Sequence, residues 1–411
     1  MKSAKKDPFY KVVVVGGGFG GVTAALRLAK DKRCLVTLVS DKDSMLYHPL
    51  LFSTGSGITR KHTSIPLSRI FARSRVTVVN DTVVGLDTSR KLIVGAARQY
   101  EYDSVVFALG SVTNYFDIGG LESGSWNIKT EDSVEAFRRH LHDELTTTKH
   151  YDKQFVVIGA GPVGVELAAA MNDHLLRVGA HHAIKHPNVG ITLIDAAPRV
   201  LPKLSQATSK ATLKRLRSKG VRVLLGVSVK RLDDHTLIAG DTIIPTNTIA
   251  WTSGAASHPF YAAHDTTFHV NKRGAVSVNE YLEVTRNIFV IGDNAATKFT
   301  GFAQTAHHNG KYVAKVVRKR LSGDQPTPYL PKRPFSVIPV GHKWAVFEQG
   351  RFHIWGLGAA GIRKFADLVG YMHVLPFADS LQLWLNEQKI ENNRCELCQK
   401  NNDSSRVAPS S

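Results

Sequence analysis

Five residues near the N-terminus have the types and spacing of a turn that holds a pyrophosphate. They follow four consecutive valines at 12–15 and precede a helical pattern at 22–30. In such a turn the first glycine permits the tight bend, the second lets the backbone approach phosphate, and the third lets the helix pack on the strand. The helix N-terminus also offers unpaired N–H groups to the phosphates. The candidate cofactor contacts are Gly16, Gly18, Phe19, Gly20 and Gly21.

A carboxylate follows at the place where it would hold ribose hydroxyls. The apolar run 35–39 predicts a second strand, and Asp41 lies twenty residues beyond Gly21. The alternative is a glycine-rich packing turn of some other α/β protein, but such a turn does not require the acid. We therefore predict a dinucleotide site in the first part of the chain.

The same arrangement recurs 143 residues later, with glycines at Gly159, Gly161 and Gly164. These glycines follow the apolar run 155–158, and the next predicted strand, 191–194, ends on Asp195. The histidine-rich segment 180–190 indicates an insertion after the helix. A carboxylate in the position of Asp195 repels a 2′-phosphate, so NADH is favoured over NADPH. The chain is therefore predicted to bind two dinucleotides.

Composition sets limits on partners and compartment. The 411 residues predict two or three domains, and 53 Lys and Arg against 34 Asp and Glu give a net charge of +19. The basic residues are dispersed and no nucleic-acid motif is present, so an anionic membrane surface is favoured as partner and nucleic acid is not. No signal peptide and no apolar run of about eighteen residues is apparent, so membrane contact is expected from one side only.

Three cysteines, Cys34, Cys395 and Cys398, imply no disulfide framework and favour a reducing compartment. The last two form a CxxC in a polar tail that lacks a second ligand pair. A metal or redox role for this CxxC is the alternative to an exposed pair without function, and we predict no metal site.

Apolar residues recur at helical spacing near the C-terminus, with the charged residues Arg363, Lys364 and Asp367 on the opposite side. Pro376 then ends this helix. The two apolar stripes, before and after the proline, consist of Ile362, Phe365, Leu368, Val369, Met372, Leu381, Trp384 and Leu385. They could pack on the core, form a homodimer interface, or lie in a bilayer surface.

Taken together, the segments GGGFGG, FALGSVTNYF, IGAGPVGVELA, WTSG, IFVIGDNA and FAQTAHHNGKYVA make the chain resemble the flavoproteins with two dinucleotide-binding domains. Within that superfamily it looks like the type II NADH:quinone oxidoreductases. The resemblance covers about residues 11–321. The first fingerprint and Gly292-Asp293 are shared by the superfamily, whereas SVTNYF and the pair Ala303-Gln304 are more specific to the quinone-reducing branch.

The resemblance implies FAD on the first half of the chain and NADH on the second. It places Asp293 at the ribityl and phosphate side of FAD, Gln304 near the quinone, and Glu166 as a proton carrier. His307, where the family often has glutamine, is a further candidate for passing a proton near neutral pH. Two departures stand out, because the family's ribose acid falls on Ser40, not Asp41, and because His307 and His308 replace glutamines. Further implied cofactor contacts are Pro49, Gly110, Gly254, Gly292 and Ala303.

The function that this resemblance implies is NADH oxidation with two-electron reduction of a membrane quinone, without proton pumping. Residues 35–394 contain no cysteine, so the thiol relay of disulfide reductases and of sulfide:quinone relatives is missing. The alternatives are an NAD(P)H-dependent reductase of a ferredoxin-type or small-molecule acceptor and a redox-sensing flavoprotein. A peripheral position on the cytoplasmic face of the cell membrane is expected.

The expected fold class is α/β, with two Rossmann-like domains and a C-terminal appendage of short amphipathic helices. The FAD-binding domain is predicted to be split around the inserted NAD(H)-binding domain. The predicted boundaries are 8–118 and 285–330 for the FAD-binding domain, 119–284 for the NAD(H)-binding domain, 331–391 for the membrane- or dimer-facing region, and 392–411 for a disordered polar tail.

Overall fold

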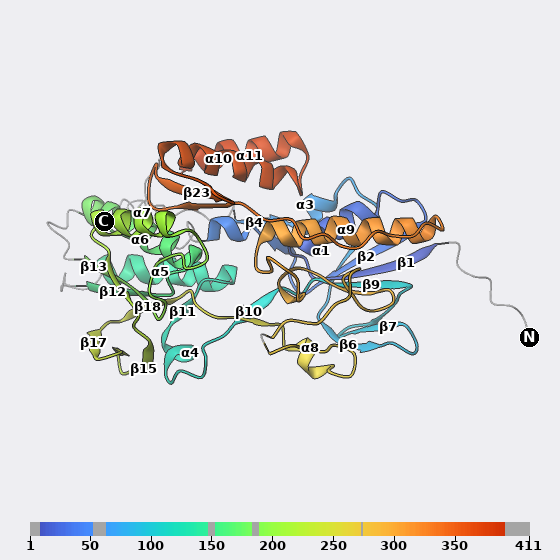
Figure 1. Cartoon of the computed structure of the whole chain (residues 1–411), viewed down its shortest axis with the longest axis horizontal. Helices are drawn as coiled ribbons and strands as arrows, with labels where there is room; N and C mark the ends of the chain where they lie inside the picture. Colours follow the sequence, from blue (N-terminus) through green and yellow to red (C-terminus); the bar gives the residue numbers. More distant parts are fainter. Residues whose placement is uncertain (1–8, 52–62, 147–152, 183–188, 273, 391–411) are drawn as a thin grey trace, which may run out of the picture.

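A computed structural model describes residues 9–51, 63–146, 153–182, 189–272 and 274–390. Two α/β lobes lie side by side, and the C-terminal helices run along one flank of both (Figure 1). The fold is the α/β arrangement of two parallel sheets that the sequence predicts. The CxxC of the tail lies outside the described residues.

The first sheet carries the first fingerprint and has the strand order β20-β21-β9-β1-β2-β5. All neighbours in it are parallel except β20 and β21. Helix α1 packs on it beside α9, and the two helices approach so closely that a Cβ on Gly310 would lie 2.5 Å from the Gly20 carbonyl oxygen. The bounds are β1 Tyr10–Val15, α1 Phe19–Leu28, β2 Cys34–Ser40, β5 Val76–Asn80, β9 Ser104–Phe107, β20 Glu283–Thr285, β21 Ile288–Val290 and α9 Ala303–Leu321.

The second sheet carries the second fingerprint and has the order β11-β18-β12-β13-β14, with all neighbours parallel. Its strands and helices all come from the chain between β9 and β20. Their bounds are β11 Trp126–Asn127, α5 Glu131–Thr146, β12 Lys153–Ile158, α6 Pro162–His181, β13 Val189–Asp195, α7 Gln206–Ser218, β14 Arg222–Leu225 and β18 Thr248–Trp251. The second lobe is therefore an insertion into the first, and the exact boundaries 118 and 284 stay predictions.

A short antiparallel pair joins the lobes where the chain leaves the first and returns to it. Strand β10, Ser111–Thr113, pairs with β19, Ala255–Ser257, in the register Ser111↔Ser257. The smaller elements are β3 Ser44–Leu46, η1 His48–Leu50, β4 Ser64–Pro66, α3 Leu67–Phe71, β6 Val83–Asp87, β7 Leu92–Gly95, β8 Gln99–Glu101, α4 Leu121–Gly124, β15 Val229–Asp233, β16 Thr236–Ala239, β17 Thr242–Pro245, α8 Phe260–Ala263 and η3 Gly292–Asn294.

The C-terminal region is a three-stranded antiparallel sheet followed by two helices that lie above α9 (Figure 1). Its elements are β22 Ser336–Pro339, β23 Ala345–Gln349, β24 Phe352–Gly356, α10 Leu357–Met372 and α11 Phe377–Ile390. The buried Glu348 carboxylate accepts hydrogen bonds from the hydroxyls of Ser205 and Thr208, both at 2.6 Å, at the start of α7. Within the described residues, no helix combines the length and the apolar composition needed to span a bilayer.

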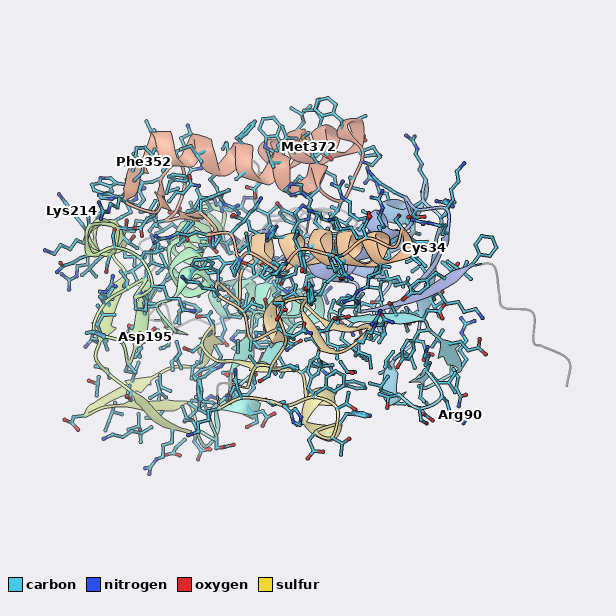
Figure 2. All side chains as sticks on the ribbon, turned by 45° about the vertical axis from the view of Figure 1, so that its right-hand side comes forward. Cys34, Arg90, Asp195, Lys214, Phe352 and Met372 are labelled. Carbon is cyan, nitrogen blue, oxygen red and sulfur yellow. The ribbon has the colours of Figure 1, made fainter. Side chains whose placement is uncertain are left out.

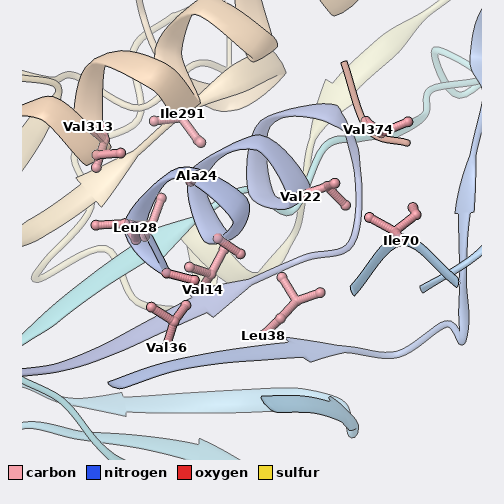
Figure 3. Close-up of a cluster of buried hydrophobic side chains, with 14 of the residues drawn as sticks. Val14, Val22, Ala24, Leu28, Val36, Leu38, Ile70, Ile291, Val313 and Val374 are labelled. Carbon is pink, nitrogen blue, oxygen red and sulfur yellow. The ribbon is translucent and has the colours of Figure 1, made fainter. Parts of the chain in front are cut away.

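The core of the first lobe includes the C-terminal region. Val14 and Val36 from the sheet and Ala24 from α1 are fully buried, and Val374, which follows α10, belongs to the same cluster. Figure 3 shows Val374 and Ile70 beside α1 in this cluster. The appendage is therefore joined to the cofactor half of the protein by apolar packing.

Most expected elements are present, with shifted ends. The expected strand 76–80 is β5, and the predicted β-type run 335–352 forms β22 and β23 and reaches β24. Helix α6 runs to His181, so the expectation that an insertion begins at residue 180 is wrong. Helix α1 starts at Phe19, before the expected residue 22, because the helix N-terminus is part of the fingerprint turn.

Candidate dinucleotide and electron-transfer sites

The first fingerprint has the backbone that its glycines predict. Gly16 has a φ of +108°, a conformation that L side chains rarely adopt, and a Cβ on Gly21 would collide with the Gly16 carbonyl oxygen. By contrast, nothing lies within 4 Å of a Cβ placed on Gly18. No side chain caps the N-terminus of α1. Open space beside uncapped backbone amides fits a pyrophosphate.

The second fingerprint repeats this geometry. Gly159 has a φ of +111°, a Cβ on Gly164 would collide with the Gly159 carbonyl oxygen, and Gly161 again faces open space. Helix α6 likewise has no side-chain cap at Gly161. Both turns therefore have room for the phosphates of a dinucleotide.

Strand register shows which residues occupy the ribose-acid position. Val15 pairs with Val39 in the first sheet, and Ile158 pairs with Ile194 in the second. The residues that come next are Ser40 and Asp195, and these two are therefore equivalent. Asp41 lies one residue beyond, with an exposed side chain 3.9 Å from the Lys42 ammonium. Its contact to a ribose stays a prediction.

Asp195 is held over the second glycine-rich turn. Its carboxylate accepts hydrogen bonds from the backbone N–H of Ala160 at 2.5 Å and of Ala197 at 2.7 Å. The side chain is half-buried and lies beside the fingerprint, where an adenosine ribose would be bound.

Asp293 lies between the two lobes, at the carboxyl end of β21. Its Oδ2 accepts a hydrogen bond of 3.2 Å from the Ser111 hydroxyl, and the Asn309 amide oxygen accepts one from the backbone N–H of Gly292 at 3.1 Å. Lys129, which the sequence did not single out, donates to the Val112 carbonyl at 2.6 Å. Burial lowers the pKa of Lys129, and the nearby Asp293 charge opposes that shift. A cation thus faces the carboxylate expected at the flavin.

Glu166 faces charged residues of the C-terminal helix. Burial raises the pKa of this α6 carboxyl to about 8, while the Arg363 charge lowers it and the Asp367 charge raises it. Arg363 Nη1 donates to Asp367 Oδ1 at 2.5 Å. A carboxyl with this pKa holds a proton at neutral pH and releases it just above, which suits a proton donor.

The charged side of α10 points inward, contrary to the amphipathic pattern in which charge faces water. Arg363 and Asp367 are 9% and 3% exposed, whereas Phe365 and Met372 are 64% and 45% exposed. Of the three alternatives left open for the apolar stripe, packing on the core does not apply to this outer side of the helix. The two charged groups lie inside because they pair with each other and are within electrostatic reach of the half-buried Glu166.

Gln304 and His307 begin α9. The Gln304 amide donates to the Phe335 carbonyl at 3.1 Å and accepts from the Phe335 N–H at 3.3 Å, so its side chain is fixed. His307 Nδ1 lies 2.7 Å from the Thr23 hydroxyl, and its ring stacks on His373 at 3.9 Å. Burial first, and then electrostatic repulsion from a protonated His373 and from Lys311, lowers the pKa of His307 to about 3. A ring with this pKa is neutral at pH 7, which favours the hydrogen-bonding role, and proton transfer by His307 stays a prediction.

An aromatic contact connects the first fingerprint with the C-terminal helix. Tyr47 lies 5.5 Å from the ring of Phe19 and stacks on Tyr371 at 4.6 Å. Sequence reasoning missed this contact, since nothing local pairs residues from opposite ends of the chain. The remaining candidates lie on turns or element starts around the two sheets, namely Pro49 in η1, Gly110 before β10, Gly254 before β19, Gly292 in η3 and Ala303 at the start of α9.

Comparisons with known proteins agree with this geometry. The chain is 29% identical to a type II NADH:quinone oxidoreductase, Ndh, of Mycobacterium tuberculosis over 359 residues, which is 81% of this chain and 76% of the relative. It is 24% identical to a type II NADH:quinone oxidoreductase of Staphylococcus aureus over 338 residues, which is 76% of this chain and 83% of the relative.

Solved structures show the same fold. NDH2 from Plasmodium falciparum in complex with NADH superposes with a TM-score of 0.84 at 18% identity, covering 94% of this chain and 99% of that one. Sulfide:quinone oxidoreductase from Aquifex aeolicus gives a TM-score of 0.75 at 19% identity, covering 87% and 89%.

A family model described as pyridine nucleotide-disulphide oxidoreductase matches residues 10–310, which include both fingerprints and Asp293. The chain therefore belongs to the pyridine nucleotide-disulphide oxidoreductase family.

Proposed function

We propose that this protein is a non-proton-pumping NADH dehydrogenase that passes two electrons from NADH through FAD to a membrane quinone. The observation that carries the proposal is the pair of equivalent glycine turns. Only the second turn has a carboxylate, that of Asp195, at the strand position where the family binds the ribose. The named relatives are type II NADH:quinone oxidoreductases. We assign FAD to the first turn and NADH to the second.

Bound flavin supplies the redox chemistry, because it accepts a hydride from NADH and releases electrons to a quinone. The protein positions NADH, FAD and the quinone, and it supplies the proton that the reaction needs. Asp195 holds the NADH ribose, Asp293 the ribityl side of FAD, and Lys129 places positive charge beside that carboxylate. Glu166 supplies a proton from the α6 side, and the fixed amide of Gln304 borders the quinone.

The absence of cysteine between residues 35 and 394 favours an acceptor that takes electrons directly from the flavin. A disulfide or persulfide relay needs thiols beside the flavin, and Cys34 is a buried residue at the start of β2, before the end of that strand where ligands bind. Electrons must then pass from flavin to an acceptor without a protein thiol.

An exposed apolar surface supports a peripheral position on an anionic membrane. Among the side chains of the C-terminal region that the structure describes, seven large apolar ones are at least 45% exposed, namely Phe352, Trp355, Leu357, Phe365, Met372, Phe377 and Leu385. Figure 2 shows Phe352 and Met372 on the side opposite Arg90. Exposed apolar groups of this size mark an interaction surface. We propose that this surface lies in the headgroup region at the cytoplasmic face of the membrane, with a homodimer as the competing occupant.

An absorbance experiment tests the redox function. Purified protein is expected to show an oxidised flavin spectrum that NADH bleaches and a short-chain quinone restores without oxygen. If NADH bleaches the flavin and quinone does not restore it, the acceptor assignment is wrong. If no flavin is bound, the assignment of the first turn is wrong as well.

A matched pair of variants tests the membrane surface. Phe365→Ser with Met372→Ser removes two exposed apolar groups of α10, whereas Val84→Ser with Ile243→Ser removes two groups that are 53% and 67% exposed on β6 and β17. Cosedimentation with anionic vesicles should fall for the first pair only. Unchanged cosedimentation, together with a dimer in the native protein that the α10 pair dissociates, would assign the surface to a homodimer.

A further inference from the structure

A strongly basic groove of about 480 Å³ runs between α1 and α9, away from both fingerprint turns. Two carboxylates, Asp31 and Asp324, contribute to the lining. Its cationic residues are Arg27, Arg33, Lys311, Lys315, Arg318 and Lys319. Six cations against two carboxylates leave an excess positive charge that a bound anion would neutralise.

Part of this charge has a structural role. Arg33 pairs with Asp31 at 2.8 Å and donates to the Leu321 carbonyl at 2.8 Å. Arg318 lies 3.8 Å from the same Asp31, in the last turn of α9. The hydrogen bonds and charge of Arg33 lower the pKa of Asp31 to about 2, so this carboxylate is fully engaged.

Arg27, Lys311 and Lys315 have no ion-pair partner in the part of the chain that the structure describes. A cation in the last turn of a helix is explained by the helix dipole, but Lys311 and Lys315 lie further back in α9, which ends at Leu321. Lys311 is also half-buried, unlike an ordinary solvated lysine. Burial and then the charges of Arg27 and Lys332 lower the pKa of Lys311. These like charges are held together at a cost that an anion would offset.

One end of the groove lies near the exposed apolar surface, because His373, just after α10, stacks on His307, which precedes the groove residue Lys311 by about one turn of α9. His373 is within electrostatic reach of Lys311 and Arg27, and the charges of these two residues add to the effect of partial burial in lowering its pKa. Its neighbour Met372 is 45% exposed, and Phe377 at the start of α11 is 61% exposed. A ligand with a phosphate in the groove and acyl chains against α10 and α11 would fill both the basic groove and the exposed apolar surface. Free phosphate would fill only the groove.

We propose that this groove binds the phosphate of an anionic phospholipid headgroup, with Arg27, Lys311 and Lys315 as its ligands. The choice of a lipid rests on the proposed membrane position, and it does not depend on the redox activity. The bound headgroup would fix the depth and tilt of the protein at the bilayer, because the groove and the apolar surface lie on different elements.

Calorimetric titration of the FAD-loaded full chain tests the site in solution. The probes are dihexanoyl phosphatidylglycerol below its micelle concentration, dihexanoyl phosphatidylcholine, and inorganic phosphate. The site variant is Arg27→Gln with Lys315→Gln. The control is Arg90→Gln with Lys230→Gln, which makes the same charge change on β6–β7 and β15, on the side opposite α10 (Figure 1).

The expected result is that phosphatidylglycerol binds, that phosphatidylcholine does not, and that the site variant loses about tenfold or more in affinity, because two charge-assisted contacts are removed. The control variant should bind like the native chain. Inorganic phosphate that binds as tightly as the lipid would overturn the lipid assignment. No binding of any probe, or equal binding by site and control variants, would overturn the site. NADH turnover with a water-soluble quinone should be equal in the native chain, the site variant and the control variant. A failure of the proposed redox function is therefore distinguishable from a failure of the proposed lipid site.

Discussion

Gly370 is where α10 contacts Tyr47, and substituting alanine there should loosen the C-terminal helices. A Cβ on Gly370 would overlap the Tyr47 hydroxyl and lie 3.0 Å from Cζ. Tyr47 is 2% exposed, stacks on Tyr371 and contacts the tilted ring of Phe19, so the ring has little room to move. The side chain and the helix must therefore separate.

The magnitude follows from two opposing effects. Overpacking a buried site costs about 1–3 kcal/mol. Replacing glycine by alanine inside a helix returns about 0.8–1 kcal/mol through backbone propensity. The net loss for Gly370→Ala is then about 0–2 kcal/mol, and it falls on the contact between α10 and the first fingerprint. Gly361→Ala is the control, because the same helix has nothing within 4 Å of a Cβ at that position. That change should stabilise α10 by about 0.8–1 kcal/mol.

Hydrogen exchange of peptides from α10 measures this difference directly, since exchange reports local opening. Gly370→Ala should exchange faster than the native chain and Gly361→Ala more slowly. Adding Tyr47→Phe to Gly370→Ala should recover part of the protection, because the hydroxyl is removed while Cζ remains at 3.0 Å. If both glycine variants protect α10 equally, the packing of α10 on Tyr47 described here is wrong.

Three further predictions concern the site. Burial raises the pKa of Glu166 from 4.5 to about 8, so the folded protein holds a proton that the unfolded chain releases between these pH values. Stability should fall as pH rises through that window, and Glu166→Gln should flatten the fall in denaturant titrations. Asp195→Asn keeps an oxygen that accepts the hydrogen bond from the turn but removes the charge, so it should narrow the preference in kcat/KM for NADH over NADPH. A native enzyme that prefers NADPH would contradict the assignment of Asp195 to the NADH ribose. Gln304→Leu should slow flavin reoxidation by quinone in stopped-flow traces while NADH reduction stays near native, whereas equal losses would indicate structural damage.

Local patterns were sufficient to predict the two sheets and their glycine turns. A buried strand, a turn that only glycine permits and a helix behind it are neighbours in sequence, so Gly16 and Gly159 could be placed without a structure. The resemblance to the family already assigned the ribose-acid position to Ser40, and the pairing between strands confirms that Ser40, and not Asp41, is equivalent to Asp195.

Contacts between distant segments could not be predicted. Tyr47 and Tyr371 come from opposite ends of the chain, and no periodicity connects them. The pattern of α10 predicted an amphipathic helix but could not tell which side meets water. Arg363 and Asp367 lie inside because burying a charge is tolerated only beside partners, and those partners are each other and the distant Glu166.

The insertion of one lobe into the other has a consequence for the order in which the chain acquires structure during synthesis. The first sheet needs β21 beside β9, and β21 is made about 180 residues after β9. At roughly 5–20 residues per second, a ribosome takes about 10–35 s to cover that distance. All strands of the second sheet appear within this interval. We therefore expect the NADH lobe to fold first, and the nascent chain to retain FAD only after β21 and α9 have left the ribosome.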